Sequence, residues 1–241
     1  MVSLAPGDTG AYVTAMRFVV TGANRGIGLE FVRQLTSRGE EVDATARDPD
    51  DAPELAALVR PGVLLGIHRL DVASDASVAA FAKALPPGPI DVLIDNAGVS
   101  GVKGGEPIDP ADILRVFDVN AVGTLRVVRA LLPGLRAGKG RKIVNLTSQL
   151  GSIAEASGGR YAYRMSKAAL NMATRLLAAD LRAEGILTVA LHPGWVQTRM
   201  GGSAAPVPPE QSIRGMLRIV DGLTAEQSGR VFDFQGREIP W

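Results

Sequence analysis

Short runs of apolar and β-branched residues alternate along the chain with longer segments in which apolar residues recur every three or four positions. The short runs predict strands, which we expect at residues 17–21, 41–46, 63–70, 90–94, 142–146, 186–191 and 230–234. The longer segments predict helices, which we expect at residues 28–37, 52–59, 74–85, 109–119, 122–136, 163–184 and 210–222. Strands that alternate with helices are typical of a parallel sheet covered on both faces.

The connections between these elements predict the topology. Right-handed crossovers turn such an alternation into an α/β fold, a doubly wound Rossmann domain with a seven-stranded parallel sheet. No Pro/Ser-rich linker and no internal repeat divides the chain, so we expect one domain over residues 16–241 and a disordered extension over residues 1–15. Ligands of doubly wound folds bind at the carboxyl ends of the strands, so we expect the loops that leave those ends to carry the chemistry.

Composition narrows the class of protein. Of the 241 residues, 46% are hydrophobic and 21% charged, as in ordinary globular domains. The 26 Lys and Arg balance 25 Asp and Glu, so charge gives no reason to expect nucleic acid or an anionic membrane as partner. Cysteine is absent, which excludes disulfides and thiol catalysis, and with only two His we expect no metal site. No apolar run reaches about 18 residues and no secretory pattern is found, so we expect a cytoplasmic protein.

The loop after the first predicted strand is rich in glycine and opens a helix. In that context glycines permit a tight turn and a close approach of a pyrophosphate to the backbone, while the helix N-terminus supplies free N–H groups. The sequence therefore predicts a dinucleotide site that includes Gly22, Asn24, Arg25, Gly26, Ile27 and Gly28.

The end of the second predicted strand bears on which dinucleotide binds. NAD-binding folds carry an acidic residue there that accepts from the ribose 2′-OH, whereas residues 45–46 are neutral and Arg47 follows them. Arg47 and Arg25 would together clamp a 2′-phosphate, which predicts NADP(H), with NAD(H) as the alternative. Two other interpretations stay open: Arg47 pairs with the aspartates that follow it, or a shift of two residues brings Asp43 or Asp48 to the ribose.

Tyr163 and Lys167 stand four residues apart at the start of the longest predicted helix, so they share one face. A free tyrosine has a pKa of about 10 and is a poor acid or base at neutral pH. A neighbouring ammonium group favours the phenolate and lowers that pKa, which is the tuning that general acid–base catalysis by tyrosine requires.

Seven motifs follow one another over about residues 16–234: the glycine loop at 21–28, Asp71-Val72, Asn96-Ala97-Gly98, Asn120, Ser148, Tyr163-x-x-x-Lys167 and Pro193-Gly194-x-Val196-x-Thr198. On these motifs the chain resembles the short-chain dehydrogenase/reductase family. The segments at residues 151–172 and 232–241 resemble the C-factor-like (sniffer-like) branch of that family.

The resemblance implies roles close to the reacting atoms. Tyr163 would exchange a proton with the carbonyl or alcohol oxygen, and Lys167 would lower the pKa of Tyr163 and hold the nicotinamide ribose. Ser148 would hydrogen-bond the substrate oxygen, and Asn120 would bind a water in a proton relay to Lys167.

The other matched residues are implied to bind the cofactor. Asp71 and the backbone of Val72 would bind the adenine, and the segment 96–98 would line the adenosine ribose. The last motif would hold the nicotinamide carboxamide and comprises Pro193, Gly194, Val196 and Thr198. His192, which precedes this motif, either touches substrate or is a hydrogen-bonded structural residue.

The chain departs from the family's pattern in two places. Asp95 stands where the family has the first Asn of Asn-Asn-Ala-Gly, a change that we expect to be tolerated locally. The gap from Ser148 to the tyrosine is two residues longer than the common spacing; residues 158–159 would accommodate it, and Ser152 is the alternative to Ser148. We expect Thr147 to point to the other face of its strand, because side chains alternate along a strand.

We therefore expect an NADP-dependent oxidoreductase that transfers a hydride between nicotinamide and a carbonyl or secondary alcohol, with tyrosine as general acid or base. The loops at residues 99–107, 149–160 and 199–209 are mostly small and apolar, which indicates a small uncharged substrate. Family members assemble through helices that match 122–136 and 163–184, which implies a homodimer or homotetramer. The alternative is a dinucleotide-binding signalling protein of the C-factor type with little turnover.

Overall fold

The computed structural model describes residues 15–102 and 108–241, so almost all of the extension expected at 1–15 lies outside the described residues. The strands form a seven-stranded parallel sheet in the order β3-β2-β1-β4-β5-β6-β7. Their bounds are β1 Arg17–Val20, β2 Glu41–Ala46, β3 Leu64–Arg69, β4 Val92–Asp95, β5 Lys142–Leu146, β6 Leu187–His192 and β7 Val231–Asp233. The predicted doubly wound parallel sheet is confirmed.

Helices alternate with the strands, with bounds α1 Gly26–Ser37, α2 Pro53–Ala56, α3 Asp75–Ala84, α4 Pro110–Phe117, α5 Gly123–Ala137, α6 Tyr161–Asp180 and α7 Pro209–Asp221. The helix expected at 52–59 is only one turn long, because Leu55 is its one buried side chain and a short helix depends on tertiary packing. The helices expected at 109–119 and 122–136 are joined by a π-helical turn over Asp118–Val122. Among the described residues, no helix has the length and apolar character needed to cross a bilayer.

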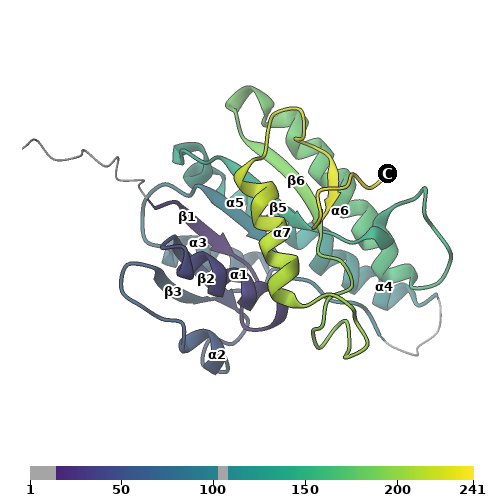
Figure 1. The fold of residues 1–241 in the computed structure, drawn as a ribbon, viewed down its shortest axis with the longest axis horizontal. Helices are drawn as coiled ribbons and strands as arrows, with labels where there is room; N and C mark the ends of the chain where they lie inside the picture. Colours follow the sequence, from purple (N-terminus) through teal and green to yellow (C-terminus); the bar gives the residue numbers. More distant parts are fainter. Residues whose placement is uncertain (1–14, 103–107) are drawn as a thin grey trace, which may run out of the picture.

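Two hydrophobic layers enclose the sheet, and Figure 1 shows α1 and α7 in front of the strands. On that side Phe18 and Val144 belong to one cluster with apolar residues of α1 and α7. On the opposite side Val19 and Ile143 belong to a second cluster with residues of α3 and α5. All four residues of β1 are buried, as expected for a strand that is covered on both faces.

The direction of winding reverses between β1 and β4. The chain moves from β1 outward through β2 to β3 and then crosses back to β4. The loops after β1 and β4 therefore lead in opposite directions from the carboxyl edge of the sheet. Doubly wound folds bind ligands in the crevice at such a switch point. The glycine loop follows β1 and residues 96–98 follow β4, so both predicted cofactor segments lie at this place.

Candidate active site

The glycine loop is built so tightly that residue 28 has no room for a side chain. A Cβ at Gly28 would overlap the carbonyl oxygen of Gly22 and lie 2.5 Å from Nδ2 of Asn96. That amide group donates to the carbonyls of Thr21 and Gly22 at 2.8 and 2.9 Å, so the loop after β4 fixes the loop after β1. Arg25, which caps α1, makes no side-chain cap bond, and the first N–H groups of the helix are available to a phosphate.

Three arginines gather beside this loop. The pKa of Arg25 is lowered first by burial and then by the positive charges of Arg199 and Arg47. Among the described residues, no carboxylate pairs with any of the three guanidinium groups, so the cluster carries an unbalanced positive charge. The sequence prediction had named Arg25 and Arg47 but had not named Arg199, which lies far away along the chain.

The acidic residues that would have favoured a free ribose hydroxyl have other partners. Asp43 is fully buried in β2, where it accepts hydrogen bonds from Arg17 and pairs with His68, each at 2.8 Å. Asp48 pairs with Arg69 at 3.1 Å instead of with Arg47. In the described residues, therefore, Asp43 and Asp48 pair with groups other than Arg47, and Asp50 lies 3.8 Å from Arg69.

Tyr163, Ser148 and Lys167 come together from two elements. Ser148 follows β5, and its hydroxyl accepts from the N–H of Leu150, which fixes the start of a short 3-10 turn at Gln149–Gly151. The same hydroxyl is hydrogen-bonded to the Tyr163 phenol. Lys167 lies one turn farther along α6, with Nζ 5.8 Å from the centre of the Tyr163 ring.

Ser152, the alternative to Ser148, is engaged elsewhere. Its hydroxyl donates to the main-chain carbonyl of Trp241 at 3.4 Å and accepts from the N–H of Glu155 at 3.3 Å. Thr147 donates to Asn171 at 2.6 Å, on the same helix α6 that carries Tyr163, so its expected orientation away from Ser148 stays a prediction. Ser148 is therefore the serine that the structure places against the tyrosine.

Burial is the largest influence on the pKa of both Tyr163 and Lys167. Burial raises the pKa of Tyr163, and the hydrogen bond from Ser148 and the charge of Arg160 offset only part of that rise. Nζ of Lys167 donates to the main-chain carbonyl of Leu146 at 2.6 Å, and burial lowers the pKa of Lys167 to about 8. Arg160, which lies 5.4 Å from the Tyr163 ring centre, is a second cation that the sequence prediction missed.

Asn120 lies in the π-helical turn, an irregularity that is frequent at functional sites. Its amide donates to the carbonyl of Val99 at 2.9 Å and to Ser166 at 3.0 Å, and its oxygen accepts from the N–H of Val99 at 2.8 Å. A Cβ at Gly98 would lie 3.2 Å from Oδ1 of Asn120 and 3.7 Å from Nζ of Lys167. The structure thus brings Asn120, Lys167 and the loop after β4 together, with the Asn120 amide holding that loop against α6.

The last motif closes over the glycine loop. A Cβ at Gly26 would touch the side-chain methyl of Thr198 at 3.4 Å. Thr198 accepts from the N–H of Gly201 at 3.1 Å, and the Pro193 carbonyl accepts from Ser212 of α7 at 2.6 Å. This loop therefore lies within reach of the pyrophosphate end of the predicted cofactor site.

The two residues predicted to bind adenine, Asp71 and Val72, follow β3. The Asp71 carboxylate accepts from the N–H of Ala73 at 3.0 Å. Val72 packs against the first turn of α5, where a Cβ at Gly123 would lie 2.8 Å from its side chain. The two residues are held in place at the edge of the sheet, and their part in binding adenine stays a prediction.

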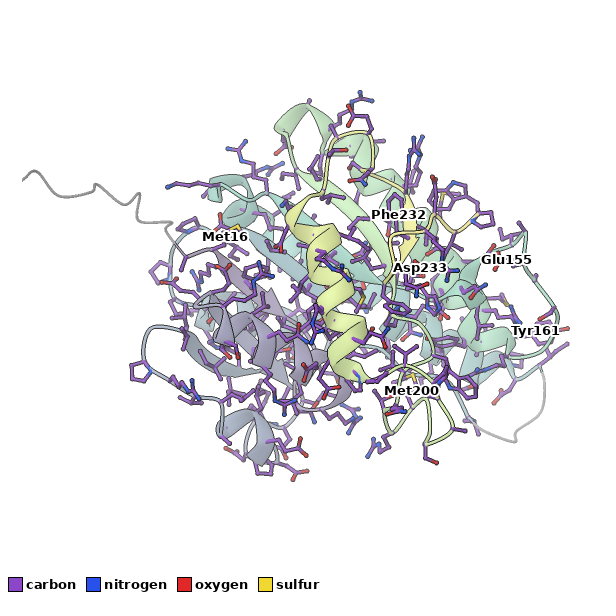
Figure 2. The ribbon with its side chains drawn as sticks, in the orientation of Figure 1. Met16, Glu155, Tyr161, Met200, Phe232 and Asp233 are labelled. Carbon is purple, nitrogen blue, oxygen red and sulfur yellow. The ribbon has the colours of Figure 1, made fainter. Side chains whose placement is uncertain are left out.

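A cavity of about 400 Å³ is lined by Gln149, which follows Ser148 in the chain, and by Gly194 and Trp195 of the last motif. Its lining is mostly polar, in contrast to the apolar loops on which the expectation of an uncharged substrate rested, and consists of Gln149, Glu155, His192, Gly194, Trp195, Val207, Asp233, Phe234, Arg237, Glu238 and Ile239. Figure 2 shows Glu155 and Asp233 on the same side of the molecule, although they are distant in sequence. Burial lowers the pKa of His192 to about 4, so the imidazole is neutral, and its Nδ1 has no partner among the described residues.

Comparison with known families matches residues 17–207 to the short chain dehydrogenases. C-signal of Myxococcus xanthus is 58% identical over 164 residues, which cover 67% of this chain and 99% of that protein. The 1-hydroxy-2-glutathionyl-2-methyl-3-butene dehydrogenase of Rhodococcus sp. (strain AD45) is 36% identical over 231 residues, 92% of this chain and 98% of that protein.

Solved structures are similar over almost the whole chain. NADPH-bound carbonyl reductase from chicken fatty liver is 35% identical with a TM-score of 0.87, over 94% of this chain and 99% of that one. Carbonyl reductase Sniffer of D. melanogaster is 31% identical with a TM-score of 0.87, over 94% of this chain and all of that one. These similarities confirm the resemblance to the C-factor-like and sniffer-like branch, and the chain belongs to the short-chain dehydrogenase family.

Proposed function

We propose that this chain is an NADP-dependent oxidoreductase that interconverts a carbonyl compound and its secondary alcohol. The observation that carries the proposal is the meeting of Tyr163, Ser148 and Lys167 at the carboxyl edge of the sheet, beside the glycine loop. Family membership and the carbonyl reductases among its structural relatives support the same class of reaction.

In the reducing direction the carbonyl carbon gains a hydride, which NADPH supplies when bound, and the oxygen gains a proton. Tyr163 donates that proton; burial raises the pKa of the phenol and so keeps it protonated at neutral pH. Ser148 hydrogen-bonds the same oxygen and holds it within reach of the phenol. The ammonium group of Lys167 stabilises the phenolate that forms, and the site must regain its proton before the next turnover.

The cluster of Arg25, Arg47 and Arg199 supports NADP(H) as the cofactor. A ribose 2′-phosphate is a dianion that guanidinium groups bind through charge-assisted hydrogen bonds, whereas a 2′-hydroxyl gives three positive charges nothing to neutralise. NADPH is bound in the related chicken reductase.

We predict that Arg47→Ala raises the KM for NADPH by about 10-fold to 100-fold and leaves the KM for NADH within about twofold, because a hydrogen bond to a charged group contributes about 1.5–3 kcal/mol. The measurement is kcat/KM with each cofactor. Arg129→Ala is the control, since Arg129 is an exposed arginine of α5 that pairs with Asp75. Equal losses with both cofactors would contradict the assigned role of Arg47.

The cavity that Gln149 helps to line is the space that we assign to the substrate. We propose that its reacting carbonyl lies at Ser148 and Tyr163 and that the remainder occupies the polar cavity of about 400 Å³, a size suited to a small molecule. Neutral His192 and Gln149 offer it hydrogen bonds, and the charged side chains of Glu155, Asp233, Arg237 and Glu238 line the same cavity, which agrees with a polar substrate.

The test of the proposed activity is NADPH consumption against a panel of small aldehydes and ketones, scored by kcat/KM and by alcohol product. We expect at least one polar carbonyl compound to be reduced at a rate that Ser148→Ala lowers by more than tenfold. Turnover that is absent across the panel, despite a dissociation constant for NADPH in the micromolar range, would favour the second candidate function.

That second function is a dinucleotide-binding signalling protein with little turnover. The observation that favours it is the 58% identity to C-signal of Myxococcus xanthus. The presence of Tyr163, Ser148 and Lys167 in one site argues for retained chemistry.

We further propose that the protein forms a homodimer or homotetramer. Leu125 of α5 and Met165, Met172 and Leu176 of α6 are exposed apolar side chains on the two helices that the family uses for assembly. Light scattering gives the mass directly, and a monomer at micromolar concentration would refute this proposal.

A further inference from the structure

Two buried oxygen atoms on neighbouring strands lack a hydrogen-bond donor among the residues that the structure describes. They are Oδ2 of Asp95, at the end of β4, and Oδ1 of Asn145, in β5. The two residues are register partners in the parallel ladder. Partners in register point to the same face of a sheet, and their strands lie about 4.8 Å apart, so the two side chains stand next to each other.

The orientation of the Asn145 amide is set from α6. The hydroxyl of Thr174 donates its proton to the Leu170 carbonyl at 2.8 Å. The Thr174 oxygen can therefore only accept a hydrogen bond from Asn145. Asn145 must therefore present its Nδ2, which donates to Thr174 at 2.8 Å. Oδ1 is consequently turned away from α6 and still needs a donor.

Two oxygen acceptors cannot bond to each other unless one of them carries a proton. The amide oxygen of Asn145 has none, and a carboxyl group is the only one of the two that takes up a proton at ordinary pH. We propose that Asp95 is a neutral carboxylic acid in the folded protein and donates from Oδ2 to Oδ1 of Asn145. One proton then satisfies both buried oxygens and completes a chain of donors from Asp95 through Asn145 and Thr174 to Leu170.

The surroundings of Asp95 agree with a neutral acid. Burial alone raises the pKa of its carboxyl group well above the ordinary value, and no charged group in the described part of the chain opposes that effect. On the neighbouring β1 and α6, Arg17 binds Asp43, and Lys167 donates to the Leu146 carbonyl. The ionisable groups of β5 and α5 also have other partners. Lys142 donates to the Val220 carbonyl, and the arginines of α5 pair with Asp75, Asp118 and Glu184.

The chain of donors joins the two halves of the candidate active site. Asp95 immediately precedes residues 96–98, which hold the glycine loop, and Thr174 lies on α6, the helix that presents Tyr163 and Lys167. Asp95 is thus a positioning residue, which fixes the spacing between the cofactor loop and the catalytic helix. The positioning role rests on the proposed function, whereas the protonated state of Asp95 does not.

The test is the pH dependence of unfolding of the wild type and of Asp95→Asn, whose amide donates to Asn145 without taking up a proton. An unfolded aspartate has a pKa of about 3.9, so above that pH wild-type folding takes up one proton and stability falls as pH rises, until the raised pKa of the folded state is passed. We therefore expect the unfolding constant of the wild type, relative to Asp95→Asn, to increase about tenfold for each pH unit in urea titrations from pH 5 to 8. Parallel curves would overturn the proposal.

Infrared spectroscopy gives a direct second measurement on the folded protein at neutral pH. We expect a protonated-carboxyl C=O band in the wild type that is lost in Asp95→Asn, and identical spectra in this region would overturn the proposal even if a variant were unstable.

The positioning role has its own readout. Asp95→Leu, which leaves Asn145 without a donor, should lower kcat by about fivefold or more, and Asp95→Asn should restore wild-type kcat with the same KM for NADPH. A kcat that is equal in Asp95→Leu and the wild type would refute the positioning role. The protonation state of Asp95 is tested separately, by the infrared and stability measurements.

Discussion

Replacement of Tyr163 by Phe is expected to lower kcat for carbonyl reduction by about 10²-fold to 10⁴-fold, the range that general acid catalysis contributes. The change removes the one hydroxyl that both bonds Ser148 and carries the proton for the substrate oxygen. The ring itself stays near Arg160 and Lys167, so NADPH affinity should stay within about threefold of the wild type. Steady-state kinetics and a fluorescence titration with NADPH measure the two quantities separately.

Tyr161→Phe is the matched control for this experiment. Tyr161 begins the same helix two residues earlier, is 40% exposed and has no lysine four residues on. We expect its kcat to be unchanged. Near-native turnover by Tyr163→Phe, or an equal loss in both variants, would show that the proton comes from another group.

Gly28→Ala is expected to abolish tight NADPH binding, with a rise in dissociation constant of at least about tenfold, and to destabilise the fold by about 1–3 kcal/mol. The added methyl group meets the Gly22 carbonyl, Nδ2 of Asn96 at 2.5 Å and Cα of Ala23 at 3.0 Å. Two of these three are backbone atoms, so the loop must open to relieve the overlap. Thermal unfolding with and without NADPH measures both effects, and the melting point of the free protein should fall by about 2–10 °C.

Gly222→Ala is the control for a glycine change of the same size. A Cβ at Gly222 would have only the Arg218 carbonyl nearby, at an ordinary 3.6 Å, and its φ of −95° is open to alanine. We expect it to bind NADPH as the wild type does. If Gly28→Ala also bound NADPH normally, the glycine loop would not be the pyrophosphate site.

The sheet was predictable because its strands are short, apolar and separated by helices, and right-handed crossovers leave few ways to order them. The positions of Tyr163 and Lys167 followed from helical spacing alone. The π-helical turn at Asp118–Val122 did not, because nothing in the local pattern distinguishes one extra residue in a turn from the gap between two helices. That turn sets the position of Asn120 against Val99 and Ser166.

The missing parts of the site depend on contacts between distant segments. Arg199 joins Arg25 and Arg47 only because the loop after β6 closes over the loop after β1. The polar cavity contains Asp233 and Arg237 because β7 pairs with β6, which brings the end of the chain beside Gln149. The direction of the Tyr163 pKa was also out of reach, since burial decides it and burial is a property of the whole fold.

The buried group of Asp43, Arg17 and His68 has a consequence for the evolution of cofactor choice. Asp43 is part of the buried sheet. If its carboxylate turned to bind a ribose hydroxyl, the buried Arg17 would lose its partner. A change of preference between the two dinucleotides therefore requires substitutions at the exposed Arg25, Arg47 and Arg199 or at the strand end, residues 46–47. Stability and cofactor choice are thus inherited on separate residues, so a lineage can exchange one coenzyme for the other without rebuilding its core.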